Sequence, residues 1–481
     1  MPKEKPNILF LLIDSLNSKN CLENDKTSIT PNIDSLIKNG VCFDQTISCA
    51  STTVPSICSM FTGTYPFNSI VVEETLYKLN TQIQNFIQIL ERDGYSVSGF
   101  IPDVIKHIDL EHIFHSKLET FDSFSTTYDI LGEKIVNVLE HKKMKHPWFL
   151  YLHLYDLHGT ATFYKNKPDN FQDAKFGKNQ YDRMISALDV WIGKFLQHVD
   201  MDNTLIILTA DHGSDVSTYN LELEKKHNYY IKIRDSAHQN NLAVKTGVKF
   251  SSKIPKILIP LKKKISTKIK DTKKNKEEEI IQSEFEKIRG ENLSPYEKRR
   301  LENCIHVTTQ CFDDRYRIPL IFSGKFIPSN LKIHKQVRNI DIFPTILELL
   351  DIPFTNPYIE SKSLLPLIKG ERADDLTAYM DSIGNTVGQR TDNVVGIRTS
   401  DFKYFRDRKK TEYNTHLFNL KIDPLEENNL SEKYSDITKK MEKMLLEINP
   451  NNDFYPDSVQ NSTDKEEEER INEQLRKMGY T

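Results

Sequence analysis

Uninterrupted apolar runs, each followed by a residue type that binds metals, are the main pattern along this chain. One run covers residues 7–13 and ends at Asp14, a second covers residues 148–154, and a third covers residues 204–208. Short runs of this kind are typical of strands in a parallel sheet whose two faces are covered by helices. Such sheets bind ligands outside the carboxyl ends of their strands. The pattern therefore predicts an α/β fold with a metal site along one edge of its sheet.

The second and third runs also lead into acidic and imidazole side chains. Asp156 and His158 follow the second run, and Asp211 and His212 follow the third. Carboxylate oxygens with imidazole nitrogens suit Mn²⁺, Zn²⁺, Mg²⁺ or Ca²⁺, and the sequence does not choose among these ions. We therefore expect one or two divalent metal ions per chain at this edge of the sheet.

Length and charge narrow the class of protein. At 481 residues the chain exceeds a typical single domain, so a large domain and a smaller one are expected. The 65 Lys and Arg residues nearly balance 68 Asp and Glu residues, and a formal net charge of −3 gives no general attraction to nucleic acid.

The first apolar run bears on where the protein works. It is too short for a transmembrane helix and no small-residue cleavage site follows it, so we expect a strand rather than a signal peptide. The six cysteines form neither a disulfide framework nor a zinc spacing. These features predict a cytoplasmic protein, and they leave its oligomeric state open.

Residues 51–63 contain the hydroxyl group on which the catalytic prediction depends. Pro55 suits the first turn of a helix, because its missing N–H would be unpaired there in any case. Thr53 would then lie at or beside the N-cap, near free backbone N–H groups and the positive end of the helix dipole. Its hydroxyl is either a plain N-cap or a nucleophile favoured by the helix end and by a bound cation. The local sequence does not decide between the two, whereas the clusters at the strand ends can supply the cation.

The order of these motifs resembles that of a sulfatase-type member of the alkaline phosphatase superfamily, and the resemblance covers most of the chain. The matching segments are residues 6–16, 30–36, 53–66, 153–158, 211–213, 312–321, 341–346, 363–367, 396–404, 417–430 and 478–480. The resemblance implies a three-layer α/β/α sandwich over residues 1–375. It also implies a smaller C-terminal α+β part over residues 376–481, with antiparallel strands and a terminal helix.

Two positions depart from the motif of the family's sulfatases. Those enzymes begin a C/S-x-P-x-R motif with a Cys or Ser that is converted to formylglycine, whereas this chain has Thr53 there and Ile57 where the arginine belongs. Threonine cannot give that aldehyde, because its oxidation product would be a ketone. The match therefore resembles the family's threonine-nucleophile branch, which includes phosphodiesterases, phosphoethanolamine transferases and phosphoglycerol transferases.

This resemblance predicts a metal-dependent hydrolase or transferase that acts on phosphate esters. We expect Asp14, Thr53, Asp211 and His212 to bind the metal. Thr53 would attack phosphorus to give a covalent phospho-enzyme, and water or an acceptor alcohol would release it. One alternative is a sulfuric ester hydrolase, and another is an inactive relative that binds a glycan or a lipid. The intact ligand set argues against the inactive relative.

Three further residues form a second predicted group. Asp156 and His158 lie two apart beyond a strand, so their side chains can turn the same way, and His306 comes shortly before the segment at 312–321. Together they could bind a second metal ion, with Asp156 as a ligand, or His158 and His306 could hold the substrate and protonate its leaving group. Alternatively, Asp156 caps a helix and His158 packs locally. His153, inside its apolar run, is expected to be a core histidine.

An insertion of about residues 214–305 interrupts the resemblance. It contains a basic tract at 262–276, and residues 294–297 have the form of a capping box, which predicts a helix over about 295–303. The tract could contact a membrane peripherally through anionic lipids, or a polyanionic glycan. The insertion could also be a lid over the substrate, or a solvated helical excursion. The expected substrate is a phosphate or sulfate ester, either free or linked to a glycan or lipid.

Overall fold

A computed structural model of the chain describes residues 5–450 with internal gaps. The gaps are residues 74–75, 109, 115–117, 124, 141–143, 159–170, 215–282, 284–285, 288–289, 291, 306–310, 357, 372–374 and 386–393. The chain divides into two compact units, of which the larger comprises residues 1–218 and 309–481 and the smaller comprises residues 219–308.

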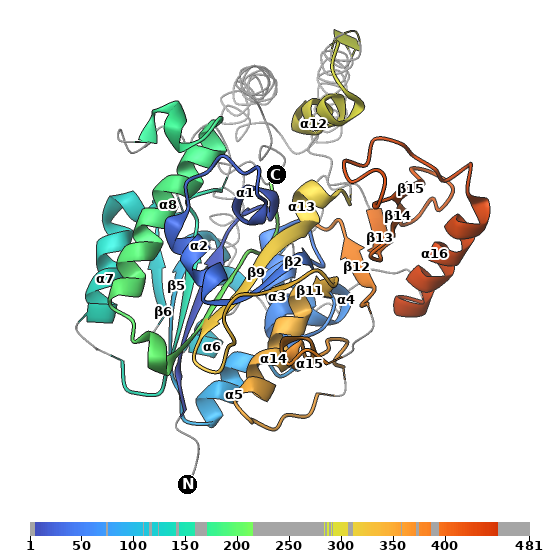
Figure 1. Cartoon of the computed structure of the whole chain (residues 1–481). Helices are drawn as coiled ribbons and strands as arrows, with labels where there is room; N and C mark the ends of the chain where they lie inside the picture. Colours follow the sequence, from blue (N-terminus) through green and yellow to red (C-terminus); the bar gives the residue numbers. More distant parts are fainter. Residues whose placement is uncertain are drawn as a thin grey trace, which may run out of the picture. The chain divides into compact units, whose positions relative to one another are not determined.

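A nine-stranded mixed sheet forms the centre of the larger unit (Figure 1). Its strands are β1 (Asn7–Ile13), β2 (Gly40–Ile47), β5 (Ser96–Pro102), β6 (Leu118–Phe121), β7 (Trp148–Leu154), β8 (Thr204–Thr209), β9 (Arg317–Gly324), β10 (Leu331–Ile333) and β11 (Val337–Arg338). Eight of them follow the order β10-β2-β9-β8-β1-β7-β5-β6, and β11 pairs with β2. The three apolar runs are thus the adjacent central strands β7, β1 and β8, as their burial requires.

Strand direction departs from the parallel sheet that the sequence pattern predicts. The strands β8, β1, β7, β5 and β6 are parallel, whereas β9 runs antiparallel to both β8 and β2. A strand buried on both faces gives the same apolar run in either direction, so the sequence of β9 does not reveal its orientation.

Two groups of helices cover the two faces of this sheet (Figure 1). One group is α2 (Pro31–Lys38), α7 (Gly132–Glu140) and α8 (Gln180–Gln197), and the other is α3 (Thr53–Thr62), α5 (Phe86–Arg92) and α14 (Ile342–Leu349). Phe61 of α3 packs edge-on against Phe86 of α5 and Tyr151 of β7, with ring centroids 5.7 and 5.4 Å apart. The predicted α/β/α sandwich is confirmed.

Shorter elements complete the larger unit around these layers. They are the helices α1 (Lys19–Leu22), α4 (Pro66–Ser69), α6 (Glu111–Phe114), α13 (Asp313–Tyr316) and α15 (Leu365–Ile368), and the hairpin strands β3 (Ile70–Glu73) and β4 (Leu76–Leu79). Cys21, Cys42, Cys49, Cys58 and Cys311 are free and buried. In the described part of the chain, no helix has the length and apolar character needed to cross a membrane.

A separate four-stranded antiparallel sheet forms the C-terminal part. Its strands are β12 (Ala378–Asp381), β13 (Val394–Arg398), β14 (Phe402–Asp407) and β15 (His416–Asn419), and helix α16 (Ser435–Ile448) packs on it. Arg398 forms two hydrogen bonds of 3.0 Å with the Asp313 carboxylate, and the fully buried Lys403 also pairs with Asp313. These ion pairs join the small sheet to the segment that leads into β9. The small antiparallel sheet is confirmed, while the boundary at 375/376 and the terminal helix stay predictions, because residues 451–481 lie outside the described part of the chain.

Helix α12 (Pro295–Ile305) belongs to the smaller unit and begins with the predicted capping box. The Ser294 N–H donates to Glu297 Oε2 at 2.9 Å, and the Glu297 N–H donates to Ser294 Oγ at 3.2 Å. This reciprocal pair confirms the helix start read from the sequence. The basic tract at 262–276 and residue His306 lie outside the described residues.

Candidate metal centre

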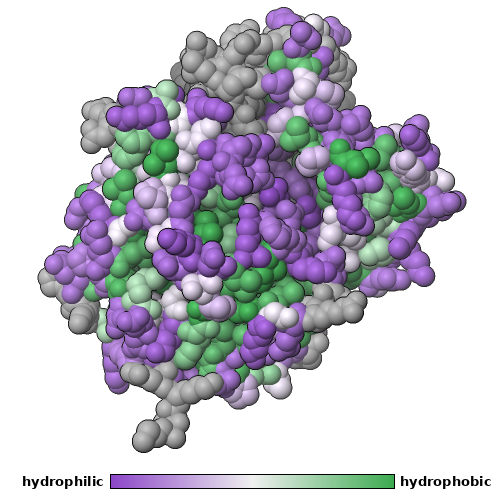
Figure 2. Space-filling model, in the orientation of Figure 1, coloured by the Kyte–Doolittle hydropathy of each residue, from purple (hydrophilic) through white to green (hydrophobic). Residues whose placement is uncertain are grey.

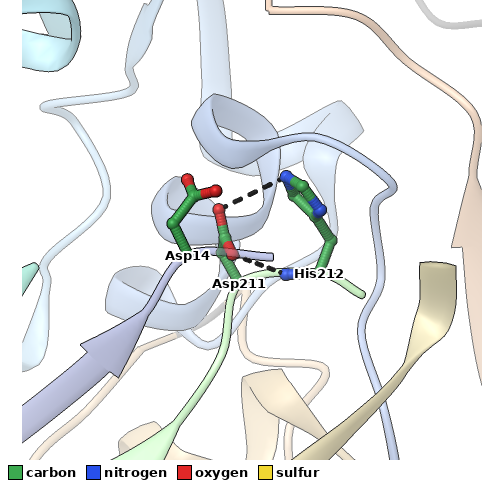
Figure 3. A group of neighbouring side chains, drawn as sticks. All are labelled: Asp14, Asp211 and His212. Atoms are coloured by element: carbon green, nitrogen blue, oxygen red, sulfur yellow. Dashed lines mark hydrogen bonds and ion pairs between the residues drawn. The ribbon is translucent and has the colours of Figure 1, made fainter. Parts of the chain in front are cut away.

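The ends of β1 and β8 bring three possible metal ligands together. These strands are parallel and Leu12 pairs with Thr209, so Asp14 follows β1 at the level where Asp211 and His212 follow β8. One ligand atom from each of these three side chains lies within 4.8 Å of the other two, and all three side chains are buried (Figure 3). The structure therefore places the predicted carboxylates and imidazole in one group at the carboxyl edge of the parallel strands.

The imidazole of His212 is held in the tautomer that a metal ligand requires. Its Nδ1 lies 2.8 Å from the carbonyl oxygen of Gly213, which can only accept a hydrogen bond. Nδ1 therefore carries a proton, and Nε2 is the ring nitrogen left to face a cation. This Nε2 lies 3.5 Å from Asp211 Oδ2 and 3.4 Å from the hydroxyl oxygen of Thr53.

Only one of the two oxygens of the Asp211 carboxylate accepts hydrogen bonds from the described residues. Its Oδ1 accepts hydrogen bonds from the backbone N–H groups of Ser15 at 3.0 Å and His212 at 2.8 Å. Its Oδ2 is buried without a hydrogen-bond partner among the described residues, an arrangement that is costly in a protein interior. Burial, followed by the nearby charge of Asp14, raises the pKa of Asp211. A divalent cation would satisfy Oδ2, so the residues present fit such an ion.

Asp14 is the most highly connected member of the group. Its Oδ1 accepts from Ser15 Oγ at 2.7 Å and lies 2.9 Å from His158 Nδ1, while its Oδ2 lies 3.1 Å from Thr53 Oγ1 and 3.5 Å from His153 Nε2. Burial by itself raises the pKa of Asp14, but the charge of His158 and the contacts with both histidines outweigh it and hold this pKa well below its ordinary value. Asp14 is therefore ionised and able to bind a cation.

Thr53 is the first residue of α3, and Thr52 occupies the N-cap position. The Thr53 hydroxyl contacts Asp14 and His212 and makes no capping hydrogen bond to its own helix. Of the two interpretations left open by the sequence, the geometry therefore favours a hydroxyl that belongs to the site. Pro55 lies in the first turn of the helix, as the sequence pattern indicates.

The start of α3 is capped by the C-terminal part of the chain. Asn385 Oδ1 accepts from the N–H of Val54 at 2.9 Å, and the hydroxyl of Thr52 donates to the carbonyl of Ile383 at 2.7 Å. Both acceptors belong to the segment after β12. This segment holds the helix end that presents Thr53, although no local motif in the sequence marks it.

The structure places Asp156 outside the metal-ligand group. Its Oδ1 accepts from the N–H of Thr127 at 3.0 Å and from the Thr127 hydroxyl at 2.6 Å. Thr127 begins the helical segment Thr127–Leu131, so Asp156 takes the helix-capping role that was the alternative to a metal ligand. Burial raises the pKa of Asp156 to about 6.

Of the two other residues of the second predicted group, His158 is described and does not contact Asp156 in the interactions found for either residue. His158 contacts Asp14, and its ring stacks on Tyr155 with centroids 4.1 Å apart. His306 lies outside the described residues, so its predicted role stays a prediction.

Sequence reasoning missed two residues of the site. Ser15 has a φ of 60°, an uncommon left-handed conformation for a serine, and it contacts both Asp14 and Asp211. His153 was expected to be an ordinary core histidine, yet its buried Nε2 lies beside Asp14. His153 lies near the end of β7, a strand that leads to the site, and this position could have indicated a role there. No feature of the sequence indicated the backbone conformation of Ser15.

Comparison with known proteins assigns the family. Residues 6–244 match the family model described as Sulfatase, and residues 308–451 match the model described as N-sulphoglucosamine sulphohydrolase, C-terminal. The chain belongs to the sulfatase family and is a sulfatase-type member of the alkaline phosphatase superfamily. Members of this family generally bind a divalent metal.

Individual relatives agree with this assignment. The chain is 24% identical over 435 residues to the Ulvan-active sulfatase of Formosa agariphila, covering 82% of this chain and 83% of the relative. It is 26% identical over 140 residues to Arylsulfatase K of Danio rerio, covering 28% of this chain. The chain spans only about a quarter of the length of the Arylsulfatase K relatives that it matches.

Solved structures show the same fold at low sequence identity. A protein in complex with its substrate D-glucosamine-2-N,6-O-disulfate aligns with a TM-score of 0.58 and 16% identity, over 93% of this chain and 98% of that one. A 2-O GAG sulfatase aligns with a TM-score of 0.59 and 16% identity, over 93% of both chains.

These findings overturn the preference for phosphate esters. The prediction of a phosphodiesterase or phosphotransferase with a threonine nucleophile and a phospho-enzyme is wrong, because the family models and the relative matched over most of the chain are sulfatases. The error came from giving a single position, Thr53, more weight than the resemblance of the whole chain. The alternative of a sulfuric ester hydrolase is the better supported one.

Proposed function

We propose that this protein hydrolyses sulfate esters of carbohydrates. The observation that carries the proposal is the buried group of Asp14, Asp211 and His212, with the Thr53 hydroxyl against it, in a chain of the sulfatase family. The reaction adds one water across the sulfur–oxygen ester bond and releases the alcohol and hydrogen sulfate. The carbohydrate part rests on the Ulvan-active relative and on the structural neighbour bound to a glucosamine disulfate.

The cation of this site would be held by Asp14, Asp211, His212 Nε2 and Thr53 Oγ1. When bound, it would supply positive charge to the non-bridging oxygens of the sulfate group, where charge increases in the transition state. Two observations support this ligand set: Asp211 Oδ2 has no hydrogen-bond partner among the described residues, and His212 uses Nδ1, rather than Nε2, for the Gly213 carbonyl.

The chain's own residues position the ester and move protons. Thr53 Oγ1 donates to Asp14 Oδ2, so the ionised Asp14 is a ready acceptor for a proton leaving the site. We assign to His158 the transfer of a proton to the departing alcohol oxygen. Asp14 fixes the Nδ1 side of the His158 ring, and stacking on Tyr155 fixes the plane of the ring.

A second candidate function is binding of a sulfated ligand without turnover. The observation that favours it is the departure at Thr53 and Ile57, since threonine cannot form the formylglycine on which the family's sulfatases depend. In this case the metal centre would hold a sulfate group that the protein recognises but does not cleave.

Sulfate release from 4-nitrocatechol sulfate and from sulfated saccharides tests the proposal. We expect turnover by the protein loaded with a divalent ion, and a loss of about 100-fold or more in Thr53→Ala. Thr62→Ala is the matched control, because Thr62 is a buried threonine of the same helix whose hydroxyl donates to the Cys58 carbonyl at 2.8 Å. Saturable binding of sulfated saccharides with no sulfate release would contradict hydrolysis and support the second candidate function, binding without turnover.

A further inference from the structure

The two carboxylates of the metal centre each have one oxygen that is already occupied by hydrogen bonds (Figure 3). Asp211 Oδ1 accepts from the backbone N–H groups of Ser15 and His212, which leaves Oδ2 for a cation. Asp14 Oδ1 accepts from Ser15 Oγ at 2.7 Å and lies 2.9 Å from His158 Nδ1, which also leaves Oδ2. Each carboxylate therefore offers a metal ion a single oxygen rather than a bidentate pair.

Two further atoms complete the set of donors. They are His212 Nε2 and Thr53 Oγ1, and the Thr53 oxygen lies beside both Asp14 Oδ2 and His212 Nε2. Asp156 also follows a strand end, but Thr127 occupies its carboxylate, and no third carboxylate joins the group among the described residues. The side chains thus supply three oxygens and one nitrogen, and their two negative charges balance one divalent ion.

A set of this composition suits Zn²⁺ better than Ca²⁺. Ca²⁺ takes about six to eight oxygen ligands and often both oxygens of a carboxylate, whereas the side chains of this site offer it far fewer. Catalytic zinc sites use carboxylate and imidazole side chains for all positions except one, which is kept for an oxygen atom of water or substrate. Asp14, Asp211 and His212 match those side chains, and the Thr53 hydroxyl supplies the remaining oxygen.

The spacing of the donor atoms separates Zn²⁺ from Mg²⁺. Both ions form bonds of about 2.0–2.1 Å, but Zn²⁺ is tetrahedral and Mg²⁺ is octahedral, so neighbouring ligand atoms are about 3.3–3.4 Å apart around Zn²⁺ and about 2.9 Å apart around Mg²⁺. Thr53 Oγ1 lies 3.1 Å from Asp14 Oδ2 and 3.4 Å from His212 Nε2. His212 Nε2 lies 3.5 Å from Asp211 Oδ2. These separations are close to the tetrahedral value, and all of them exceed the octahedral one.

We infer that the metal centre is selective for Zn²⁺ over Ca²⁺ and Mg²⁺, and that His212 is the residue that sets this selectivity. The inference rests on the proposed function, because it names the ion that the same site would use. An imidazole nitrogen is a favourable ligand for Zn²⁺, whereas Ca²⁺ and Mg²⁺ prefer oxygen. Replacement of the His212 ring by a carboxylate should therefore weaken Zn²⁺ binding and strengthen Ca²⁺ binding.

Titration of the metal-free protein with each ion alone, followed by calorimetry, tests the inference. The wild-type protein should bind one equivalent of Zn²⁺ with a Kd at least about 100-fold below the Kd for Ca²⁺ or Mg²⁺. In His212→Asp, the ratio of the Ca²⁺ Kd to the Zn²⁺ Kd should fall by about tenfold or more. If this variant does not fold, His212→Asn should give a fall in the same direction, because its amide also replaces nitrogen by oxygen.

A control is needed for zinc bound elsewhere on the protein. Hydrophilic side chains cover much of the face drawn in Figure 2, and exposed imidazoles and carboxylates bind Zn²⁺ weakly. His198 is an exposed histidine at the C-terminal end of α8. His198→Asn should therefore keep the wild-type ratio of the two Kd values.

The outcomes separate this inference from the proposed function. A Ca²⁺ or Mg²⁺ Kd equal to or below the Zn²⁺ Kd in the wild-type protein, an unchanged ratio in the folded His212 variants, or no binding of any of the three ions would overturn the selectivity. Zinc selectivity that depends on His212, without release of sulfate from any sulfate ester, would support this inference and contradict hydrolysis. Sulfate release by a protein that binds Ca²⁺ as tightly as Zn²⁺ would leave hydrolysis standing and contradict the inference.

Discussion

The hydroxyl oxygen of Thr53 lies 3.1 Å from Oδ2 of Asp14. This contact joins the first residue of α3 to the residue that follows β1, two segments 39 positions apart in the chain. The helix start and the strand end therefore form one site. A change in either residue should alter the affinity of the site for a cation.

Removing the Thr53 hydroxyl should weaken cation binding. Thr53→Ala deletes one of four proposed ligand groups, and we expect the Kd for Mn²⁺ to rise by about tenfold or more. Thr53→Ser keeps the hydroxyl and should stay within a few-fold of the wild-type protein. Calorimetric titration of the metal-free proteins measures both values. An unchanged affinity in Thr53→Ala would show that the hydroxyl is not a ligand.

His158 should affect turnover more than metal content. Its ring contacts Asp14 without belonging to the ligand group, and a positioned proton donor typically contributes about 100-fold or more to a rate. We expect His158→Phe to lower kcat for sulfate release by about that factor, while elemental analysis finds the same number of metal equivalents. Loss of the metal in this variant would instead assign His158 to the ligand set.

Asp156 should make folding stability depend on pH through its buried carboxyl group. Its pKa in the folded chain is about 6, against an ordinary value of 3.8, so the carboxyl contributes stability that is fully present below pH 3.8 and is lost as the pH rises through 6. The difference corresponds to roughly 3 kcal/mol at most. Asp156→Asn keeps an acceptor for Thr127 and removes the charge.

Urea unfolding of Asp156→Asn between pH 4 and pH 7 checks this effect. Relative to the wild-type protein, the variant should become more stable as the pH rises across that range. Its metal content should not change, because Asp156 lies outside the ligand group. A constant stability difference across the range would contradict the raised pKa of Asp156, and a loss of metal would place Asp156 in the ligand group.

Asn385 should support the site through the start of α3. Asn385→Ala removes the acceptor for the Val54 N–H, and the loss of such a cap typically costs about 1 kcal/mol of stability. We also expect weaker Mn²⁺ binding, since the helix end that presents Thr53 becomes less well held. Asn385→Asp keeps an oxygen acceptor and should restore the Mn²⁺ affinity. If Asn385→Ala lowers stability alone, its role is structural only.

The strands were predictable because burial on both faces leaves a continuous apolar run. The run at 148–154 coincides with β7, and those at 7–13 and 204–208 agree with β1 and β8 to within one residue. The direction of β9 could not be predicted, because a strand buried on both faces has the same hydrophobic pattern whether it runs parallel or antiparallel to its neighbours.

Site residues that follow strand ends could be predicted from the sequence. Site residues that are placed by contacts between distant parts of the chain could not. Asp14, Asp211 and His212 were found because parallel strands end at one edge. Asn385 reaches α3 from 331 positions away, and no local pattern records such a contact. Asp156 follows a strand end too, and its carboxylate accepts from Thr127, a contact that its position in the sequence alone does not reveal.

Parallel assays of sulfate and phosphate esters show which ester the metal centre hydrolyses and whether Thr53 is needed. Initial rates for 4-nitrocatechol sulfate and p-nitrophenyl phosphate would be compared for the metal-loaded wild-type protein, Thr53→Ala and Thr62→Ala. We expect the wild-type protein and Thr62→Ala to release sulfate faster than phosphate, and Thr53→Ala to lose the sulfate activity. Phosphate release that exceeds sulfate release, or sulfate release that persists in Thr53→Ala, would contradict this expectation.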